Sequence, residues 1–335
     1  MAAPEYPSVS VIIAVRNEEA AIRQCLESVY ATRYPNLEVI VVDDCSGDVS
    51  ADAASKFPCK IVKLEKQMGS AFARNRGAEE AGGEILFFTD ADVRLHEKTL
   101  EMIVGEFESK PELSAVFGSY GKDVVGSNFF SDYKNLVHHY GHQTAREQAS
   151  TFWSGCGAIK KAVFDEAGGF NPKQRMLYDI ELGYRLSKLG HCIHLNKNIQ
   201  VTHSKEYTFL SLVKSDVLDR AIPWTGLMFA NRVFHNDMST STGNILSTIV
   251  AYLALFALIS TAFSWYSLLI FAFLAAFFLA LNIPFYSFIY QERGALFTIK
   301  SLLMHYLSCL YSGTGLIAGV VLYITGAVLR RAASI

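Results

Sequence analysis

The stretch LFFTDADVRL, residues 86–95, decides the fold, because an apolar strand-like segment runs directly into Asp90 and Asp92. A buried strand that ends in two carboxylates separated by one small residue suits a hard divalent cation. Mg²⁺ and Mn²⁺ prefer oxygen ligands and often complete their shell with substrate phosphates. The plainer interpretation is a solvated turn that happens to carry two acids, and the surrounding sequence distinguishes the two.

Outward from this stretch, strand-like and helix-like segments alternate along the first part of the chain. Near-continuous apolar strands that alternate with helices predict an α/β fold with a mostly parallel sheet covered on both faces. The predicted strands are residues 8–15, 37–44, 59–64 and 84–90, and the predicted helices are residues 18–31 and 69–83.

Polar side chains follow several of the predicted strands at the point where each strand ends. Ligands of such sheets bind beyond the carboxyl ends of the strands, so these residues predict one shared binding site. They are Arg16, Asn17 and Glu18 after the first strand, Asp43 and Asp44 after the second, and Asp90 and Asp92 after the fourth.

The composition divides the 335-residue chain into two predicted domains. The formal net charge of −2 gives no indication of a basic surface for nucleic acid. Residues 238–290 and 301–329 contain no Asp, Glu, Lys or Arg, and each run exceeds the roughly 20 apolar residues of a membrane helix. We therefore predict a soluble-type domain at 1–232 and an all-α membrane domain at 233–335 with three or four spans. The candidate spans are residues 245–263, 265–290, 295–310 and 312–329.

The orientation of these predicted domains follows from the termini and the cysteines. The first ten residues lack a basic segment and an apolar core, which predicts that no signal peptide is present. The six cysteines show no CxxC spacing and indicate reduced thiols, so we expect an integral membrane protein whose catalytic domain faces the cytosol. Arg330 and Arg331 after the last run favour a cytosolic end and four spans, while the short 295–310 segment keeps three spans open.

Several motifs occur together in one order, and they carry a resemblance to a known family. VSVIIAVRNEEAAIRQCLESV begins at residue 9, YPNLEVIVVDDCSGD at residue 34 and ARNRGAEEAGGEILFFTDADV at residue 73. Together they resemble a family 2 glycosyltransferase of the GT-A fold, with C-terminal transmembrane helices following. The resemblance implies transfer of a sugar from a nucleotide-diphosphate donor, with inversion at the anomeric carbon and a bound Mg²⁺ or Mn²⁺.

The same resemblance implies roles for the residues at the strand ends. It places Glu18 and Asp44 at the nucleoside, with Asp43 beside them, and Asp90 near the ribose. Asp92 binds the metal, and Asp90 is a further candidate ligand. Arg74 and Arg76, which precede the DxD motif, become candidates for contact with the diphosphate. A surface salt bridge is the alternative for each arginine.

On the acceptor side, TFWSGCGAIKKAVFDEAGGFNP (151–172) resembles the family's acceptor segment, and LYDIELGYRLSKLG (177–190) follows it. By position the family's catalytic base maps onto Asp179, which takes the proton of the attacking hydroxyl. Tyr178 stands where the family more often has a Glu, so a role for a preceding acid is in doubt here. If the acceptor is a phosphate, no base is needed and Asp179 positions the acceptor or a cation. The plainer alternative is a first-turn acid favoured by the helix dipole.

Three further residues complete the predicted site. The family's histidine near metal and diphosphate maps onto His203, and Lys205 is a candidate phosphate contact. Arg220 and Trp224 lie where processive members have QxxRW, but the motif is absent, which argues against a polymerising synthase and against a polymer channel. Arg220 stays a candidate for a gating contact to the diphosphate.

One helical segment, residues 127–148, leaves its role open. His138 and His142 have the i, i+4 spacing of a zinc pair, but no third ligand is evident. Its aromatic face either packs on the sheet or lies against the bilayer as an interfacial helix.

Taken together, the residues favour a membrane-bound inverting glycosyltransferase. Its expected partners are a nucleotide-sugar donor, a lipid or lipid-linked acceptor such as a polyprenyl phosphate or glycolipid, and the membrane, but no nucleic acid. The alternative is a GT-A-like module that binds nucleotide at the membrane as a sensor or assembly partner, without transfer. The sugar, the nucleotide base and the oligomeric state are not readable from the sequence.

Overall fold

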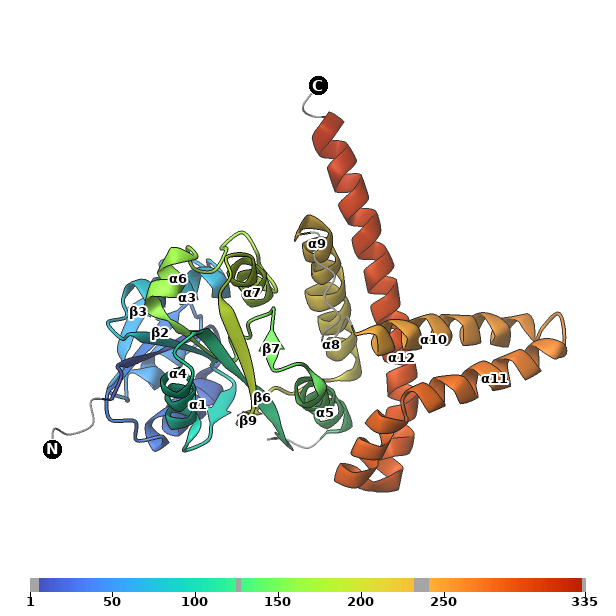
Figure 1. The fold of residues 1–335 in the computed structure, drawn as a ribbon, viewed down its shortest axis with the longest axis horizontal. Coiled ribbons are helices and arrows are strands. Elements are labelled where there is room, and N and C mark those ends of the chain that lie inside the picture. The colour runs from blue at the N-terminus through green and yellow to red at the C-terminus, as the bar shows by residue number, and fades with distance from the viewer. Residues whose placement is uncertain (1–5, 125–127, 232–240, 333–335) are drawn as a thin grey trace. The chain divides into compact units, whose positions relative to one another are not determined.

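The computed structural model describes residues 6–124, 128–231 and 241–332, with side chains up to residue 326 (Figure 1). The chain divides into two compact units. The first comprises residues 1–127 and 146–206, and the second comprises residues 128–145 and 207–335. The predicted domains, 1–232 and 233–335, were drawn by charge, and that boundary stays a prediction because residues 232–240 lie outside the described ones.

The first unit is built on one mixed sheet, to which the described residues contribute nine strands in the order β3-β2-β1-β4-β8-β6-β9-β5, with β7 paired to β9. Strands β1 to β4 form a parallel half, and β8 runs antiparallel between β4 and β6. This arrangement confirms the predicted α/β class. The strands are β1 Val9–Val15, β2 Leu37–Asp43, β3 Lys60–Lys63, β4 Ile85–Asp90, β5 Val93–Leu95, β6 Leu113–Val124, β7 Gln148–Ala149, β8 Cys156–Lys160 and β9 Cys192–His203.

Six helices belong to this unit, within the part of the chain that is described. They are α1 Glu19–Ala31, α2 Ser50–Ala54, α3 Ser70–Glu79, α4 Thr99–Ser109, α6 Lys161–Glu166 and α7 Tyr178–Lys188. The predicted strands and helices of residues 8–90 therefore agree with the structure to within a few residues. The exception is the end of α3, which closes at Glu79 because the chain enters the Gly82-Gly83 turn before β4.

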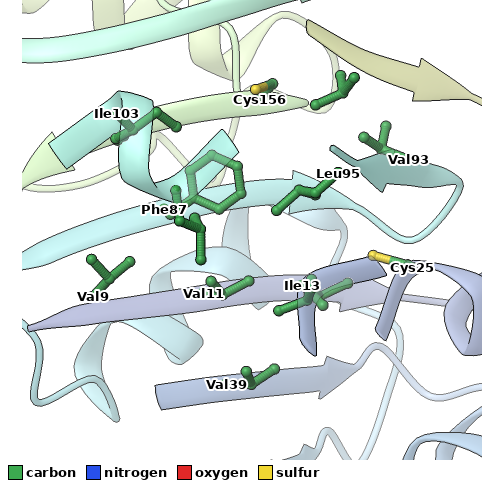
Figure 2. Packing of buried hydrophobic residues seen from close by; sticks show 14 of the residues in the cluster. Val9, Val11, Ile13, Cys25, Val39, Phe87, Val93, Leu95, Ile103 and Cys156 are labelled. Carbon is green, nitrogen blue, oxygen red and sulfur yellow. The ribbon is translucent and has the colours of Figure 1, made fainter. Parts of the chain in front are cut away.

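Alternate residues of each central strand face opposite layers, which explains why these strands are apolar throughout. Val11 and Ile13 of β1 join a buried cluster with side chains of α1 and α4 (Figure 2). Ile12, between them, faces α3. A Cβ atom added to Gly77 of α3 would lie 2.5 Å from Ile12 Cγ2, so the glycine permits the close packing of helix on strand.

The second unit consists of helices, and one of them comes from the middle of the sequence. Its elements are α5 Phe129–Thr144, α8 Phe209–Lys214, the π-helix η1 Ser215–Ala221, α9 Ile222–Asn231, α10 Thr242–Ser260, α11 Tyr266–Leu281 and α12 Ile283–Ala332. α5 packs through its aromatic face on α12, where Phe129 meets Phe297 and Tyr140 meets Phe285. Arg293 of α12 also donates two hydrogen bonds to the Asp132 carboxylate, from Nε to Oδ2 at 2.7 Å and from Nη2 to Oδ1 at 3.0 Å.

The aromatic face of α5 therefore packs on a helix, and the sheet alternative for this face is wrong. Among the residues that the structure describes, no group of three metal-binding side chains includes His138 and His142.

Two helices in this unit are long and apolar enough to cross a membrane: Thr242–Ser260, and Ile283–Gly326 of α12. Only 28% and 22% of their apolar windows are buried within the structure, so most of that surface is left open. α11 is apolar but shorter, with 16 residues. Where the sequence suggested separate segments at 295–310 and 312–329, α12 runs through both, and its break lies earlier, at Gly294 with φ 76°. The number of spans stays a prediction.

Candidate active site

The carboxyl ends of three neighbouring strands meet at one edge of the sheet. In the parallel register Val15 of β1 lies opposite Asp43 of β2, and Ala14 lies opposite Asp90 of β4. The residues that follow these positions are therefore held side by side by the backbone ladder. This is the edge at which a ligand of a parallel sheet is expected.

The two aspartates at the end of β2 are buried and organise the adjoining loops. The Asp44 carboxylate accepts backbone N–H bonds from Met68 at 2.6 Å and Gly69 at 2.9 Å, and so fixes the turn that leads into α3. Asp43 accepts the N–H of Ser46 at 3.0 Å. Their predicted contact with the nucleoside stays a prediction, and their visible role is to shape the loops around it.

Glu18 lies directly before α1, and its pKa is affected by the charges of the DxD aspartates. Its backbone N–H donates to Ser50 Oγ at 2.8 Å, which ties the loop after β1 to the start of α2. Partial withdrawal from water, and then the negative charges of Asp92 and Asp90, raise the pKa of Glu18 to about 7. The edge of the sheet thus carries an excess of negative potential, which Lys205 opposes.

Asp90 is engaged by an arginine rather than left open. Arg74 of α3 is 2% exposed, and its guanidinium forms a salt bridge with the Asp90 carboxylate. The same guanidinium lies over the ring of Tyr178, with 5.4 Å between its carbon and the ring centre. Burial raises the pKa of Asp90, while the charge of Arg74 acts in the opposite direction.

Asp92 pairs with His203, which lies near the end of the first unit's sequence. Its Oδ2 atom lies 3.5 Å from Nε2 of His203, the last residue of β9. The backbone supports this meeting, since Val93 pairs with His203 across β5 and β9 and the N–H of Ser204 donates to the Asp92 carbonyl at 2.8 Å. Burial opposes ionisation of Asp92, but His203 and the charge of Lys205 hold its pKa below the ordinary value. The ring of Tyr120 stacks on His203 at 4.6 Å.

Asp179 lies in the first turn of α7, and buried groups fix its orientation. Its Oδ2 accepts both the backbone N–H of Ser154 at 3.1 Å and the Ser154 hydroxyl at 3.2 Å, and its Oδ1 accepts the N–H of Ile180 at 2.9 Å. Leu177, before the helix, has φ 59°, a left-handed conformation that turns the chain into α7. The negative charges of both Asp179 and Asp92 raise the pKa of Asp90, so the predicted base is electrostatically coupled to the DxD motif.

Two of the predicted residues are placed elsewhere. Arg76 lies on α3 with 42% of its side chain exposed, paired with Glu79 and Glu80 at 2.7 Å each, and the structure does not bring it to the cluster. Arg220 belongs to the second unit, where its Nη1 lies 2.9 Å from His138 Nε2 and its guanidinium carbon lies 6.0 Å from the Trp224 ring centre. Contact of either arginine with a diphosphate stays a prediction.

Sequence reasoning assigned no role to Ser154, Tyr120 or the ring of Tyr178, although each contacts a predicted site residue. One signal was available for Ser154: it lies inside the WSGCG segment, between an aromatic residue and two glycines. Nothing in the local sequence of Tyr120 or Tyr178 indicates that either ring meets a charged residue from a distant segment.

The donor set near Asp92 is compatible with Mg²⁺ or Mn²⁺. One carboxylate and one imidazole lie close enough to share an ion, and Mg²⁺ commonly binds through one or two carboxylates with substrate phosphates supplying the rest. No group of three His, Cys, Asp or Glu ligands occurs among the residues that are described. Of the described side chains, Asp92 and His203 are therefore the two candidate ligands that lie together, and Asp90 is held by Arg74.

Comparison with known proteins finds a family match for residues 10–168. Residues 10–168 match the family described as glycosyl transferase family 2. The chain is 39% identical over 136 residues to the glycosyltransferase AglE of Haloferax volcanii, a match that covers 38% of this chain and only 41% of AglE. Residues 10–168 are thus similar to family 2 glycosyltransferases, the family that the motifs resemble.

Solved structures agree on the fold. The mannosyltransferase PcManGT of Pyrobaculum calidifontis, in complex with GDP-Man and Mn²⁺, has a TM-score of 0.59 at 21% identity and covers 96% of this chain and 88% of its own. TarS 1–349 of S. aureus, in complex with UDP-GlcNAc, has a TM-score of 0.52 at 17% identity and covers 89% of each chain. At these identities the likeness establishes the GT-A type fold, followed here by C-terminal helices.

Proposed function

We propose that the protein is a membrane-bound, metal-dependent, inverting glycosyltransferase that moves a sugar from a nucleotide-diphosphate donor to a lipid or lipid-linked acceptor. One observation carries this proposal: Asp92 and His203 lie together at the strand ends, beside the Arg74–Asp90 pair and electrostatically coupled to Asp179. A nucleotide-binding fold needs no such grouping of an oriented carboxylate beside a candidate cation site, whereas a group transfer does.

On the donor side, Asp92 and His203 are the residues that would hold Mg²⁺ or Mn²⁺. When bound, such an ion neutralises a diphosphate and makes it a better leaving group. Glu18, Asp43 and Asp44 are the candidate contacts for the nucleoside, and Lys205 supplies positive charge near Asp92 for the phosphates. GDP-Man and UDP-GlcNAc in the two similar structures support a nucleotide-sugar donor as the class.

On the acceptor side, Asp179 is the candidate base. Ser154 and the N–H of Ile180 fix both carboxylate oxygens, so the remaining lone pairs have a defined direction. A base held this way takes the proton of an acceptor hydroxyl as it attacks the anomeric carbon from the face opposite the leaving diphosphate, which inverts that carbon. For an already ionised phosphate acceptor, Asp179 positions the acceptor instead.

The C-terminal helices support a membrane location and hence a lipid or lipid-linked acceptor. Large apolar side chains are exposed along α10, α11 and α12, including Phe256 at 71%, Phe273 at 69% and Leu296 at 70%. A soluble protein rarely exposes so much contiguous apolar surface. A hydrocarbon environment satisfies it, and an enzyme fixed there meets membrane-resident acceptors by geometry. The catalytic unit would then face the cytosol, where nucleotide sugars are available.

The test is donor hydrolysis by the detergent-purified full chain across a panel of nucleotide sugars, with Mn²⁺, with Mg²⁺ and with EDTA. We expect metal-dependent release of nucleoside diphosphate from one donor, and transfer when a membrane lipid extract is added. Asp179→Asn serves as the paired variant, and it should reduce transfer to a hydroxyl acceptor while leaving donor binding unchanged.

Two outcomes would contradict the proposal. Donor binding without release or transfer, across all donors and with lipid extract present, would favour the nucleotide-binding membrane module. Equal release in EDTA and in Mn²⁺ would leave the transferase in place but remove the metal from its mechanism.

A further inference from the structure

Arg74 is a buried cation with few hydrogen bonds. Its side chain is 2% exposed, yet within the described residues its Nε atom has no hydrogen-bond partner and its Nη1 reaches the Ser70 carbonyl at a long 3.4 Å. The Asp90 carboxylate is its one salt-bridge partner. A buried guanidinium is costly unless its charge is well compensated, so something besides Asp90 has to hold it in place.

The ring of Tyr178 supplies that further contact. It lies under the guanidinium at 5.4 Å, a cation–π geometry that is strongest when both groups are withdrawn from water. The ring itself is fixed, because it meets Phe170 edge-on at 5.3 Å and Phe170 in turn packs on Phe88 of β4 at 4.9 Å. The Tyr178 hydroxyl lies within hydrogen-bonding reach of Ser154, which holds Asp179.

The chemistry of Tyr178 matters as much as its position. Burial raises the pKa of Tyr178 to about 12, so its hydroxyl is neutral at working pH. That hydroxyl lies within hydrogen-bonding reach of the Arg74 guanidinium, and it adds no negative charge that would draw the arginine from Asp90. A carboxylate in the volume of this ring would lie close to the guanidinium and would compete with Asp90 for it. Asp90 would then be released towards Asp92, where like charges already accumulate.

We propose that Tyr178 is a positioning residue that keeps Arg74 on Asp90, so that Asp92 and His203 are the side chains left to a divalent cation. The residue type at position 178 thereby sets how many carboxylates the cation site contains, and hence its affinity for the ion. This inference rests on the proposed function, since it concerns the metal of the same site.

The test is a titration of the metal-free full chain with Mn²⁺, in detergent and without donor. The electron paramagnetic resonance signal of free Mn²⁺ measures how much of the ion is bound. Tyr178→Glu should tighten binding by about three- to tenfold, because Asp90 becomes available as a second carboxylate. Tyr178→Phe keeps the ring and removes the hydroxyl that reaches Arg74 and Ser154, so it is the control for the ring contact, with affinity expected within about twofold of the unchanged protein. If the glutamate variant does not fold, Tyr178→Gln removes the ring without adding charge and should shift affinity the same way by about twofold to threefold.

Asp90→Asn distinguishes two explanations of tighter Mn²⁺ binding by Tyr178→Glu: the release of Asp90 from Arg74, and the added charge of the new glutamate itself. In the unchanged protein this substitution should alter Mn²⁺ affinity by less than about threefold, whereas Asp92→Asn should abolish binding. In the Tyr178→Glu background, Asp90→Asn should remove the gain. A gain that persists there, or an Asp90→Asn effect as large as that of Asp92→Asn, would overturn the inference but leave the transferase intact. Absence of Mn²⁺ binding to the unchanged protein without donor would overturn this inference, whereas the metal dependence of the proposed function is decided separately by donor hydrolysis in Mn²⁺ and in EDTA.

Discussion

In the second unit, Lys134 of α5 and Asp216 of η1 form a buried ion pair, and the Tyr311 hydroxyl donates to the same carboxylate at 2.9 Å. In the first unit, Asp90 pairs with Arg74, but Glu18 and Asp92 add further negative charge close by. The pKa values of Asp216 and Asp90, each paired with a cation, move in opposite directions. Burial opposes ionisation of Asp216, yet Lys134 and Arg220 hold its pKa below the ordinary value. The pKa values of Glu18 and Asp90 are raised.

The comparison distinguishes a buried ion pair that stabilises the fold from a cluster of like charges that a bound ligand would neutralise. A buried charge with a matched partner contributes to a defined arrangement of its elements, and removal of one partner leaves the other uncompensated. An excess of like charge costs stability and is tolerated where a ligand of opposite charge corrects it. Substitutions in the two clusters should therefore affect stability and activity in opposite proportions.

The largest expected effect is on the stability of the second unit. Lys134→Met removes the cation that is paired with the Asp216 carboxylate and leaves the charge of Arg220 and the Tyr311 hydroxyl, and we expect a loss of about 3 kcal/mol in unfolding free energy. Thermal unfolding in detergent measures it. The double variant Lys134→Met with Asp216→Leu is the control and should recover most of the loss. An unchanged melting temperature for the single variant would show that water reaches this pair.

In the first unit we expect a large effect on activity and a small effect on stability. Asp92→Asn should lower metal-dependent donor hydrolysis by about 10²- to 10³-fold, because a ligand that counters developing charge is lost. The melting temperature should change far less than for Lys134→Met. Asp52→Asn, an exposed acid on α2, is the matched control and should leave turnover unaffected. If Asp92→Asn hydrolysed the donor at the full rate, the cluster around Asp92 would not be the active site.

Ser154→Ala should have an intermediate effect. Ser154 is 2% exposed, and its hydroxyl is one of two donors to Asp179 Oδ2, so its removal loosens the base without removing it. We expect kcat of transfer to fall about tenfold, the size of one hydrogen bond to a charged group, with the donor KM unchanged. Ser109→Ala, an exposed serine that bonds within α4, is the control. A rise in donor KM at constant kcat would assign Ser154 to binding instead.

The smallest effect concerns Glu18 and depends on pH. The folded-state pKa of about 7 lies above the ordinary 4.5, so the folded protein binds the extra proton between these values. The stability that this proton contributes is complete below pH 4.5 and is lost as the pH rises through 7. Glu18→Gln should therefore stabilise the metal-free protein increasingly from pH 5 to pH 8, by at most about 1 kcal/mol given solvent screening. A melting-temperature difference that is constant with pH, or that shrinks as pH rises, would contradict this.

The sequence predicted the parallel half of the sheet well, because the signal there is local. Apolar runs bounded by Gly and acidic residues set β1, β2 and β4, and their shared direction is enough to bring Asp43, Asp44 and Asp90 to one edge. The same patterns were sufficient to identify the family.

Contacts between distant segments were beyond the reach of local patterns. Arg74 and Arg76 stand two residues apart on one helix, and only the packing of α3 shows that Arg74 is buried against the Tyr178 ring while Arg76 pairs with glutamates at the surface. The grouping of α5 with the C-terminal helices was equally hidden, since its apolar face is compatible with a sheet or with a bilayer. Its true partners lie about 150 residues later in the chain.

The place of α5 has a consequence for the order in which the protein can mature. Residues 1–206 leave the ribosome before Phe285, Phe288, Arg293 and Phe297 have been synthesised, yet these are the residues that cover the apolar face of α5 and pair with its Asp132. During translation the catalytic unit can complete its sheet while one helix in its middle stays uncovered. The arrival of α12 adds the contacts of Phe285, Phe288 and Phe297, so a helix made about 150 residues later completes a surface that α5 began. A nascent chain halted before residue 283 should accordingly bind chaperones or membrane through α5.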